Sequence, residues 1–404
     1  MNASPRRLVA IMCLAQVLVQ IGAYAWPALL PTFMTAWRLD NSDAGWITGI
    51  FYGAYTLSVP FLVSLTDRVD PKRVYLFGAA TTAAAHLAFA FLVDGFWSAL
   101  AARALAGIGW AGSYMTGLKL LSDRVEGPLM SRAVAGHAAG VGVAGALSFV
   151  FADSLASAFG WPVAFGISGA CAATAFGMIL ILAPRQPRRA AARAPAPLLD
   201  FRPVLRNRIA MAYAVGYCVH TWEMNALRGW AVAFLAFVAA GSAGAVWMSP
   251  AVVTTVMALL GTAASVLGNE ASIHWGRVRL VRIAMTLSIL CAAIIGFVGS
   301  MSYPLAVALV IAYGIVIWLD SSSLTAGTTT SAEPTRRGAT LAIHSMLGYA
   351  GGFVGPLAFG FTLDLAGGMS REAWGLAFAG VGAVVLVGQL ASEALRLRAG
   401  RQEA

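Results

Sequence analysis

The chain has 404 residues, of which 59% are hydrophobic and only 11% are charged. Soluble domains carry roughly 25% charged residues, so this composition excludes an ordinary soluble protein. The apolar residues form blocks long enough for membrane-spanning helices and too continuous for the alternating strands of a barrel. The four cysteines lie inside these blocks without metal-ligand spacing and are interpreted as core residues, so no metal site is expected.

The apolar blocks predict an all-α integral membrane protein with twelve transmembrane helices. In chain order they are 8–36, 44–66, 74–93, 98–121, 132–152, 161–183, 208–238, 246–268, 280–300, 304–327, 338–363 and 374–393. The stretch 184–207 is rich in Pro, Ala and Arg and lies between the sixth and seventh blocks. The chain is therefore predicted to contain two six-helix bundles, 1–183 and 208–404, joined by a basic cytoplasmic linker.

The basic residues predict the orientation. With both termini in the cytoplasm, 22 of the 27 Lys and Arg residues fall in cytoplasmic segments and two, Arg38 and Arg371, in outer loops. The other three lie in or beside helices. This distribution assigns the net charge of +10 to the cytoplasmic face and its anionic lipid headgroups, and no nucleic-acid partner is expected.

The two halves show weak internal similarity. "RAVAGHAAGVGVAG" and "ATLAIHSMLGYAGG" open corresponding helices and place His137 opposite His344. "GWAGSYMTG" and "IWLDSSSLT" pair Trp110 with Trp318. Such matches in one register are typical of a transporter built from two parallel repeats.

The loop "VSLTDRVDPKRVYLFG" begins at Val63 and resembles the signature loop of the major facilitator superfamily, G-x-L-x-D-R-x-G-R-R. The matching positions are Leu65, Asp67, Arg68 and Lys72, and the basic Arg73 follows directly. Val63 replaces the first glycine, and Asp70-Pro71 replaces Gly-Arg. The resemblance implies two bundles around a cavity that opens alternately to each side. It also implies gating by Asp67, Arg68 and Arg73 through a cytoplasmic latch, although a solvated charge cluster is the simpler alternative.

Two further patterns are compared with the same superfamily. "RALAGIGWAG" resembles R-x-x-x-G-x-G-x-A, which implies a part in proton coupling for Arg103; the alternative is an arginine that snorkels to the outer interface. The antiporter pattern G-x-x-x-G-P-x-x-G-G is incomplete in "GHAAGVGVAGAL", because Val141 stands where proline is expected. This departure disfavours export.

Ionisable residues at membrane depth are functional candidates because burying them in lipid is costly. Three stand out: Glu223 and Asp320 as proton-coupling groups, and Arg228 as an anion anchor. Structural pairing of Asp320 with a cation is the alternative. Glu223 and Arg228 are five positions apart, about 140° around a helix, so we expect Arg228 to face the cavity and Glu223 to meet a polar partner.

The remaining candidates are polar or aromatic residues near the expected cavity. Substrate contacts are predicted at Gln20, Tyr24, Trp110, Tyr114, Arg228 and Trp318. Packing or interface anchoring is the alternative role for the aromatic members. His137 and His344 are interpreted as an inner gate or a proton relay, and His86 as a residue of the packing or the lipid headgroup region.

The combined pattern predicts a proton-coupled secondary transporter for a small organic solute, favoured as anionic, in the bacterial inner membrane. We expect a monomer without a cofactor. No nucleotide-binding G-x-x-x-x-G-K-[ST] occurs, so ATP is not expected to drive transport directly. No catalytic residues are expected, since neither G-x-S-x-G nor H-E-x-x-H is present. Multidrug export by drug/proton antiport is the alternative transport function. A transporter-like receptor is a third possibility.

Overall fold

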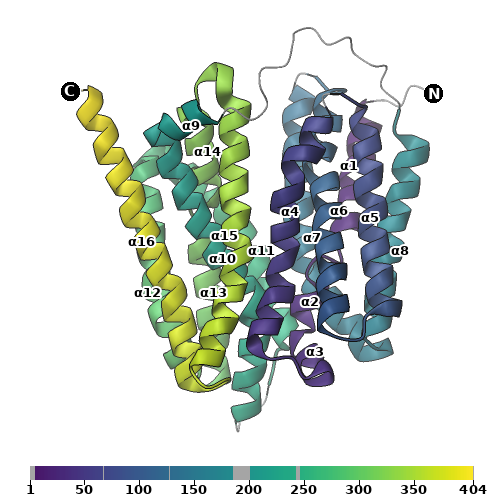
Figure 1. Ribbon diagram of the computed structural model, residues 1–404, viewed down its shortest axis with the longest axis vertical. Coiled ribbons are helices and arrows are strands. Elements are labelled where there is room, and N and C mark those ends of the chain that lie inside the picture. Colours follow the sequence, from purple (N-terminus) through teal and green to yellow (C-terminus); the bar gives the residue numbers. More distant parts are fainter. Residues whose placement is uncertain (1–4, 67, 127, 185–200, 243–245, 404) are drawn as a thin grey trace. The chain divides into compact units, whose positions relative to one another are not determined.

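The computed structural model describes residues 5–66, 68–126, 128–184, 201–242 and 246–403. All regular structure in these ranges is helical (Figure 1). Contacts divide the chain into two compact units. The first contains residues 1–38 and 50–192, and the second contains residues 39–49 and 193–404.

The first unit is a helical bundle around an apolar core. Its helices are α1 (Pro5–Gln20), α2 (Ala25–Ala28), α3 (Leu30–Trp37), most of α4 (Asn41–Leu65), α5 (Pro71–Leu92), α6 (Phe96–Ser122), α7 (Pro128–Phe159) and α8 (Trp161–Leu182). Helices α5 and α8 have proline in the first turn, where the missing N–H leaves no intrahelical bond unmade. Met12, Tyr75 and Leu120 bring α1, α5 and α6 into one buried cluster.

The second unit is built around α10. Its helices are α9 (Arg202–Arg206), α10 (Arg208–Gly241), α11 (Pro250–Trp275), α12 (Arg277–Gly299), α13 (Tyr303–Trp318), α14 (Ser321–Ser331), η1 (Pro334–Arg336), α15 (Arg337–Leu365) and α16 (Arg371–Glu403). Helix α10 packs against α13, α14, α15 and α16, so most of its length is buried. A charged residue in the middle of α10 must therefore meet other helices rather than lipid.

The all-α fold class is confirmed, and each of the twelve predicted segments overlaps a helix or a set of helices. Two segments are interrupted: 8–36 divides into α1, α2 and α3, and 304–327 divides into α13 and α14. Within the described ranges, ten helices are long and apolar enough to cross a membrane when α13 and α14 are counted together as Tyr303–Ser331. The interrupted first segment and α6 are the other two, which is consistent with twelve spans. Most of the predicted linker, residues 185–200, lies outside the described residues.

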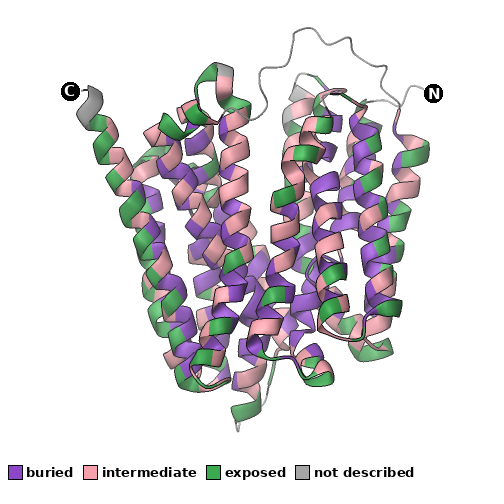
Figure 2. Cartoon of the chain, viewed as in Figure 1, coloured by how far each residue is buried: buried purple, intermediate pink, exposed green. Residues whose placement is uncertain are grey.

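Exposed apolar side chains mark the surface that meets lipid. Exposed positions recur along α16 (Figure 2), where Val387 and Leu390 are 66% and 61% exposed. Exposing such side chains to water costs free energy, whereas contact with the hydrocarbon of a bilayer does not. The ionisable side chains of Glu223, Arg228 and Asp320, by contrast, are buried.

The start of α4 belongs to the second unit. Asp364, near the end of α15, accepts hydrogen bonds from the backbone N–H groups of Asn41 and Ser42 at 3.2 and 2.7 Å. It also accepts from their side chains at 2.7 and 2.5 Å. A carboxylate at a helix N-terminus is favoured by the free N–H groups and the helix dipole, so Asp364 fixes the first turn of α4 to α15.

Candidate functional site

Helix α10 runs without a break through "YCVHTWEMNALRGW". It begins at a cap in which Oδ1 of Asn207 accepts from the backbone N–H of Ala210 at 3.0 Å. His220, Glu223 and Arg228 are 2%, 2% and 8% exposed. All three ionisable side chains are therefore packed within the protein, and each must be stabilised by neighbouring helices.

Glu223 has the polar partner that the sequence led us to expect. The hydroxyl of Tyr313, on α13, donates to Oε1 of Glu223 at 2.7 Å, and Tyr313 is only 1% exposed. This partner is a neutral hydroxyl rather than a fixed cation. The carboxyl group can therefore gain or lose a proton without leaving a buried arginine or lysine unpaired.

Asp320 lies at the interruption between α13 and α14, in the N-cap position of α14. Its side chain makes no capping bond. Instead Oδ1 of Asp320 lies 2.9 Å from Nδ1 of His220, with the two side chains 4% and 1% exposed. The structure thus pairs Asp320 with a histidine of α10, not with the arginine or lysine considered from the sequence.

The interruption is held by α11 through two glycines. A Cβ atom at Gly268 would overlap the carbonyl of Leu319, and a Cβ atom at Gly261 would lie 2.8 Å from Cδ1 of Trp318. Any larger residue at these positions would displace the end of α13. The absence of side chains on α11 therefore positions both Trp318 and the Asp320 that follows it.

Arg228 is positioned by an aromatic ring. Its guanidinium carbon lies 4.4 Å from the ring centroid of Trp318. A desolvated cation over an indole face gains about 2 kcal/mol or more. The second unit thus holds a buried cation, two buried carboxyl groups and an indole on α10, α13 and the α13–α14 interruption.

His344, on α15, is connected to the same group through Tyr217 of α10. Its ring stacks on Tyr217 with centroids 4.0 Å apart and planes at 14°. Tyr217 also stacks on His220 at 5.7 Å. The two nitrogens of His344 meet the hydroxyls of Thr325 and Thr328 of α14, at 3.2 and 2.9 Å.

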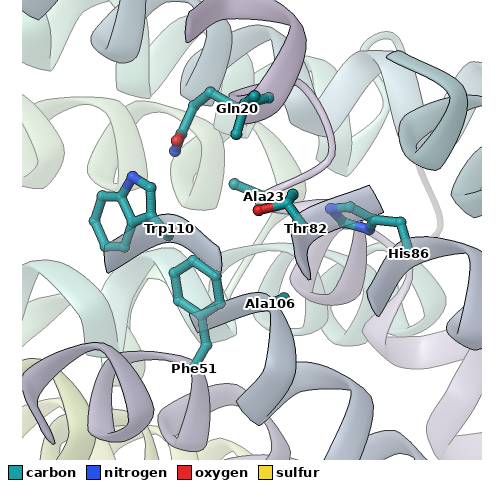
Figure 3. Close-up of a pocket in the computed structure, with 8 residues that line it drawn as sticks. Gln20, Ala23, Phe51, Thr82, His86, Ala106 and Trp110 are labelled. Atoms are coloured by element: carbon teal, nitrogen blue, oxygen red, sulfur yellow. The ribbon is translucent and has the colours of Figure 1, made fainter. Parts of the chain in front are cut away.

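The first unit contains a small cavity (Figure 3). Its lining residues are Val19, Gln20, Ala23, Phe51, Thr82, His86, Ala106 and Trp110. The cavity measures about 10 Å³, room for about one water molecule. Figure 3 shows Trp110 and His86 at opposite sides of it. His86 is 3% exposed, which bears out packing, one of the two roles expected for it, and rules out the other, a headgroup contact.

Arg103 is buried beside this cavity rather than directed to the outer interface. It is 3% exposed, and Nη1 donates to the carbonyl of Ala23 at 3.1 Å. Its guanidinium carbon lies 4.5 Å from the ring centroid of Phe51. The carbonyl of Ala23 belongs to the interruption between α1 and α2, so Arg103 stabilises that interruption and does not snorkel.

The other aromatic candidates of the first unit form stacked contacts. Tyr114 stacks on Trp110 at 5.9 Å and on His137 at 6.0 Å. Tyr24 stacks on Phe149 at 5.2 Å, and its backbone N–H donates to the hydroxyl of Ser148 at 2.9 Å. Trp110, Tyr114 and His137 thus form one continuous stack of rings, whereas Tyr24 packs on α7.

The signature loop is only partly described, because Asp67 lies outside the described residues. Arg68 and Arg73 are exposed. Asp70 caps α5 by accepting from the N–H of Lys72 at 3.0 Å and pairs with Arg124 at 2.9 Å. The residues that replace the usual Gly-Arg therefore have a structural task, while gating by the loop stays a prediction.

Several residues of this arrangement were missed by the sequence analysis. His220, Tyr313 and Phe51 directly contact Asp320, Glu223 and Arg103, respectively. For His220 the signal was its place three positions before Glu223, on the same helical stripe. Tyr313 and Phe51 carry no comparable signal in an apolar helix. Within the described residues, no group of three or more His, Cys, Asp or Glu is placed to hold a metal ion.

The helical units, the lipid-facing apolar surface and the buried ionisable groups define a polytopic helical membrane protein of the transporter class. The sequence model of the Major Facilitator Superfamily matches residues 12–356. The chain belongs to this superfamily, as its signature loop led us to expect.

Relatives and solved structures agree with this assignment. The protein spinster homolog 3 of Mus musculus is 26% identical over 238 residues, 56% of this chain and 46% of that protein. The match therefore spans less than half of the mouse protein. A crystal structure of the nucleoside transporter NupG gives a TM-score of 0.76 at 15% identity, covering 98% of this chain and 99% of the other.

A second solved structure is that of a bacterial homolog of the human lysosomal transporter Spinster, in an inward-facing and unoccupied conformation. It gives a TM-score of 0.76 at 16% identity and covers 99% of this chain and 98% of the other. At these identities the likeness shows the fold alone. The chain is thus a secondary transporter by family, and its neighbours are transporters rather than enzymes.

Proposed function

We propose that the chain is a proton-coupled secondary transporter that moves a small organic anion across the bacterial inner membrane by alternating access. In this proposal 1–183 and 208–404 are the two six-helix bundles and 184–207 is the cytoplasmic linker. Both termini are cytoplasmic, which the distribution of 22 of 27 basic residues favours. The transporter works as a monomer.

The pairing of Glu223 with Tyr313 and of Asp320 with His220 carries the proposal of proton coupling. Carboxyl groups that are tied to arginine or lysine in a membrane interior are held in the charged form. Here neither partner is a fixed cation, because Tyr313 is a neutral hydroxyl and His220 is an imidazole. This supports a role in which either carboxyl group is loaded and unloaded with a proton during the cycle.

Arg228 carries the proposal of an anionic solute. Arg228 is 8% exposed, and its guanidinium carbon is held 4.4 Å from the ring centroid of Trp318. A fixed guanidinium is suited to bidentate recognition of a carboxylate or phosphate. The indole beside it supplies apolar contact area to the rest of the solute.

The other sequence-derived assignments enter as parts of the same proposal. Gln20, Tyr24, Trp110 and Tyr114 are proposed as substrate contacts from the first bundle, with Arg103 as a coupling residue. The gating residues are proposed as Asp67, Arg68, Arg73, His137 and His344. The 2% exposure of Gln20 and the 7% exposure of Trp110 support contact with a solute only if the cavity between them enlarges during transport.

Drug/proton antiport is the competing function. Two buried carboxyl groups among aromatic rings would also attract a lipophilic cation. The two functions differ in the sign of the charge that the solute carries. Arg228 opposes a cation by direct repulsion, and for this reason the anion is favoured.

A ligand screen on the purified protein tests the proposal. Thermal unfolding is measured with organic acids, the corresponding neutral amides, nucleosides and lipophilic cations, on the parent protein and on Arg228→Gln. We expect stabilisation by an acid and not by its amide, with loss of this shift in Arg228→Gln. Stabilisation by nucleosides or by lipophilic cations that persists in Arg228→Gln would contradict the anionic solute.

A further inference from the structure

His137 and His344 occupy corresponding places in the two halves, yet their hydrogen bonds differ. Nε2 of His137 lies 3.2 Å from the carbonyl of Tyr114, which can only accept, so Nε2 carries the hydrogen. Nδ1 of His137 is buried and has no partner within the described residues. Protonation there would bury an N–H group without an acceptor, so the surroundings of His137 suit the neutral ring alone.

His344 meets two hydroxyls instead. Nδ1 lies 2.9 Å from Oγ1 of Thr328, and that hydroxyl donates to the carbonyl of Leu324 at 3.1 Å. A hydroxyl has one hydrogen, so Thr328 accepts from Nδ1–H. Thr328 is 0% exposed and serves as a fixed acceptor in either charge state of the ring.

The hydroxyl of Thr325 bonds to the other nitrogen of His344, and it can act there either as donor or as acceptor. Its Oγ1 lies 3.2 Å from Nε2 of His344, and its alternative acceptor, the carbonyl of Ser321, is at 3.4 Å. With a neutral ring the hydroxyl donates to Nε2. With a protonated ring the hydroxyl turns to Ser321 and its oxygen accepts from Nε2–H. Both charge states are satisfied without movement of a heavy atom.

His344 is 3% exposed, so a charge on its ring must be stabilised by its contacts, and a proton needs a path to the ring. Thr325 is exposed, so Nε2 lies one hydroxyl away from the surface of the protein. Tyr217 of α10 stacks on the ring at 4.0 Å and stabilises an imidazolium through its π face. Among the described residues, the titratable group that faces His344 besides Tyr217 is His220 of α10, which opposes a positive charge on His344 and itself lies 2.9 Å from Asp320. From α14 it meets hydroxyls, and on α15 the nearest charge in sequence is Arg337, about 10 Å away along the helix.

We propose that His344 is a proton-binding site of the transport cycle, in addition to Glu223 and Asp320. It takes up one proton on the lone pair of Nε2 from water that reaches Thr325, and it returns that proton to water or to the His220–Asp320 pair. Because its partners Thr325 and Thr328 lie on α14 between Asp320 and Ser331, His344 is an intermediate site for a proton that moves along the side of this helix. The inference rests on the proposed proton coupling, but the protonation itself can be measured separately.

Imidazole ¹⁵N NMR of the full-length protein in lipid nanodiscs is the direct test. Resonances are assigned by single replacements, His344→Gln and His137→Gln. As the pH is lowered, we expect His344 to change from the neutral Nδ1–H form to the doubly protonated form. His137 should remain in the neutral Nε2–H form throughout.

Variants of the threonine hydroxyls distinguish the proposed hydrogen-bond switch at Thr325 from a general disturbance of the fold. Thr325→Val should abolish the doubly protonated population of His344, whereas Thr325→Ser should retain it. Thr329→Val is the matched control, because Thr329 donates to the carbonyl of Thr325 and does not contact the ring. A neutral His344 at every pH, or unchanged titration in Thr325→Val, would overturn the inference. Solute uptake by the parent protein that ignores a pH gradient would instead overturn the proposed function and leave the His344 result standing.

Discussion

The glycines of α11 provide the sharpest structural prediction. Ordinary contacts of a Cβ atom begin at about 3.4 Å, so the 2.8 Å separation at Gly261→Ala requires Trp318 to move by a few tenths of an ångström. Gly268→Ala requires the backbone at Leu319 to move instead, because the new Cβ atom would overlap its carbonyl. Overpacking typically costs about 1–3 kcal/mol, and we expect Gly268→Ala to reach the upper end of this range.

Gly380→Ala is the matched control on α16 of the same unit. Nothing lies within 4 Å of its new Cβ atom, so the replacement should gain up to about 1 kcal/mol of helix propensity. Thermal unfolding of the purified variants measures the series, with about 2–4 °C expected for each kcal/mol. The expected order of stability is Gly380→Ala, parent, Gly261→Ala, Gly268→Ala. If Gly268→Ala proved as stable as the parent, α11 would not hold the interruption at Asp320.

Further outcomes follow from single contacts. Tyr313→Phe removes the donor that stabilises the charged form of Glu223, so the pH of half-maximal uptake should rise; an unchanged profile in proteoliposomes would exclude Glu223 from coupling. Asp364→Asn should lower stability by about 1 kcal/mol and speed amide exchange at the start of α4, and unchanged exchange there would count against this contact. Lys72→Met removes bonds from Nζ to two carbonyls at the end of α8 and should speed amide exchange there, whereas replacement of the exposed Arg73 should not.

The fold could be predicted from sequence because lipid permits few solutions. Backbone groups in hydrocarbon must be bonded within the segment, so each long apolar block had to be a helix. The interruptions were not predicted. Pro27 and Pro31 mark the first one, between α1 and α3, and were not used as signals. The second depends on Gly261 and Gly268 of another helix, which no local pattern reveals.

Part of the candidate site could also be predicted from the physical constraints that lipid imposes. The cost of burying charge singled out Glu223, Arg228 and Asp320, and all three are buried in the second unit. Their partners were not predictable, since a tyrosine such as Tyr313 in an apolar helix looks like a packing residue. The different surroundings of His137 and His344 depend on which hydroxyls and carbonyls face each ring, and this is decided only by tertiary packing.

Proton-coupled uptake is the measurement that tests the central proposal most directly. The anion identified by the ligand screen is supplied to proteoliposomes with and without an imposed pH gradient, at zero membrane potential. We expect the gradient to drive accumulation by the parent protein. The double variant Glu223→Gln, Asp320→Asn should exchange labelled for unlabelled anion across the membrane but should not accumulate it. Accumulation by the parent that is indifferent to the gradient, or gradient-driven accumulation that survives loss of both carboxyl groups, would contradict the proposal.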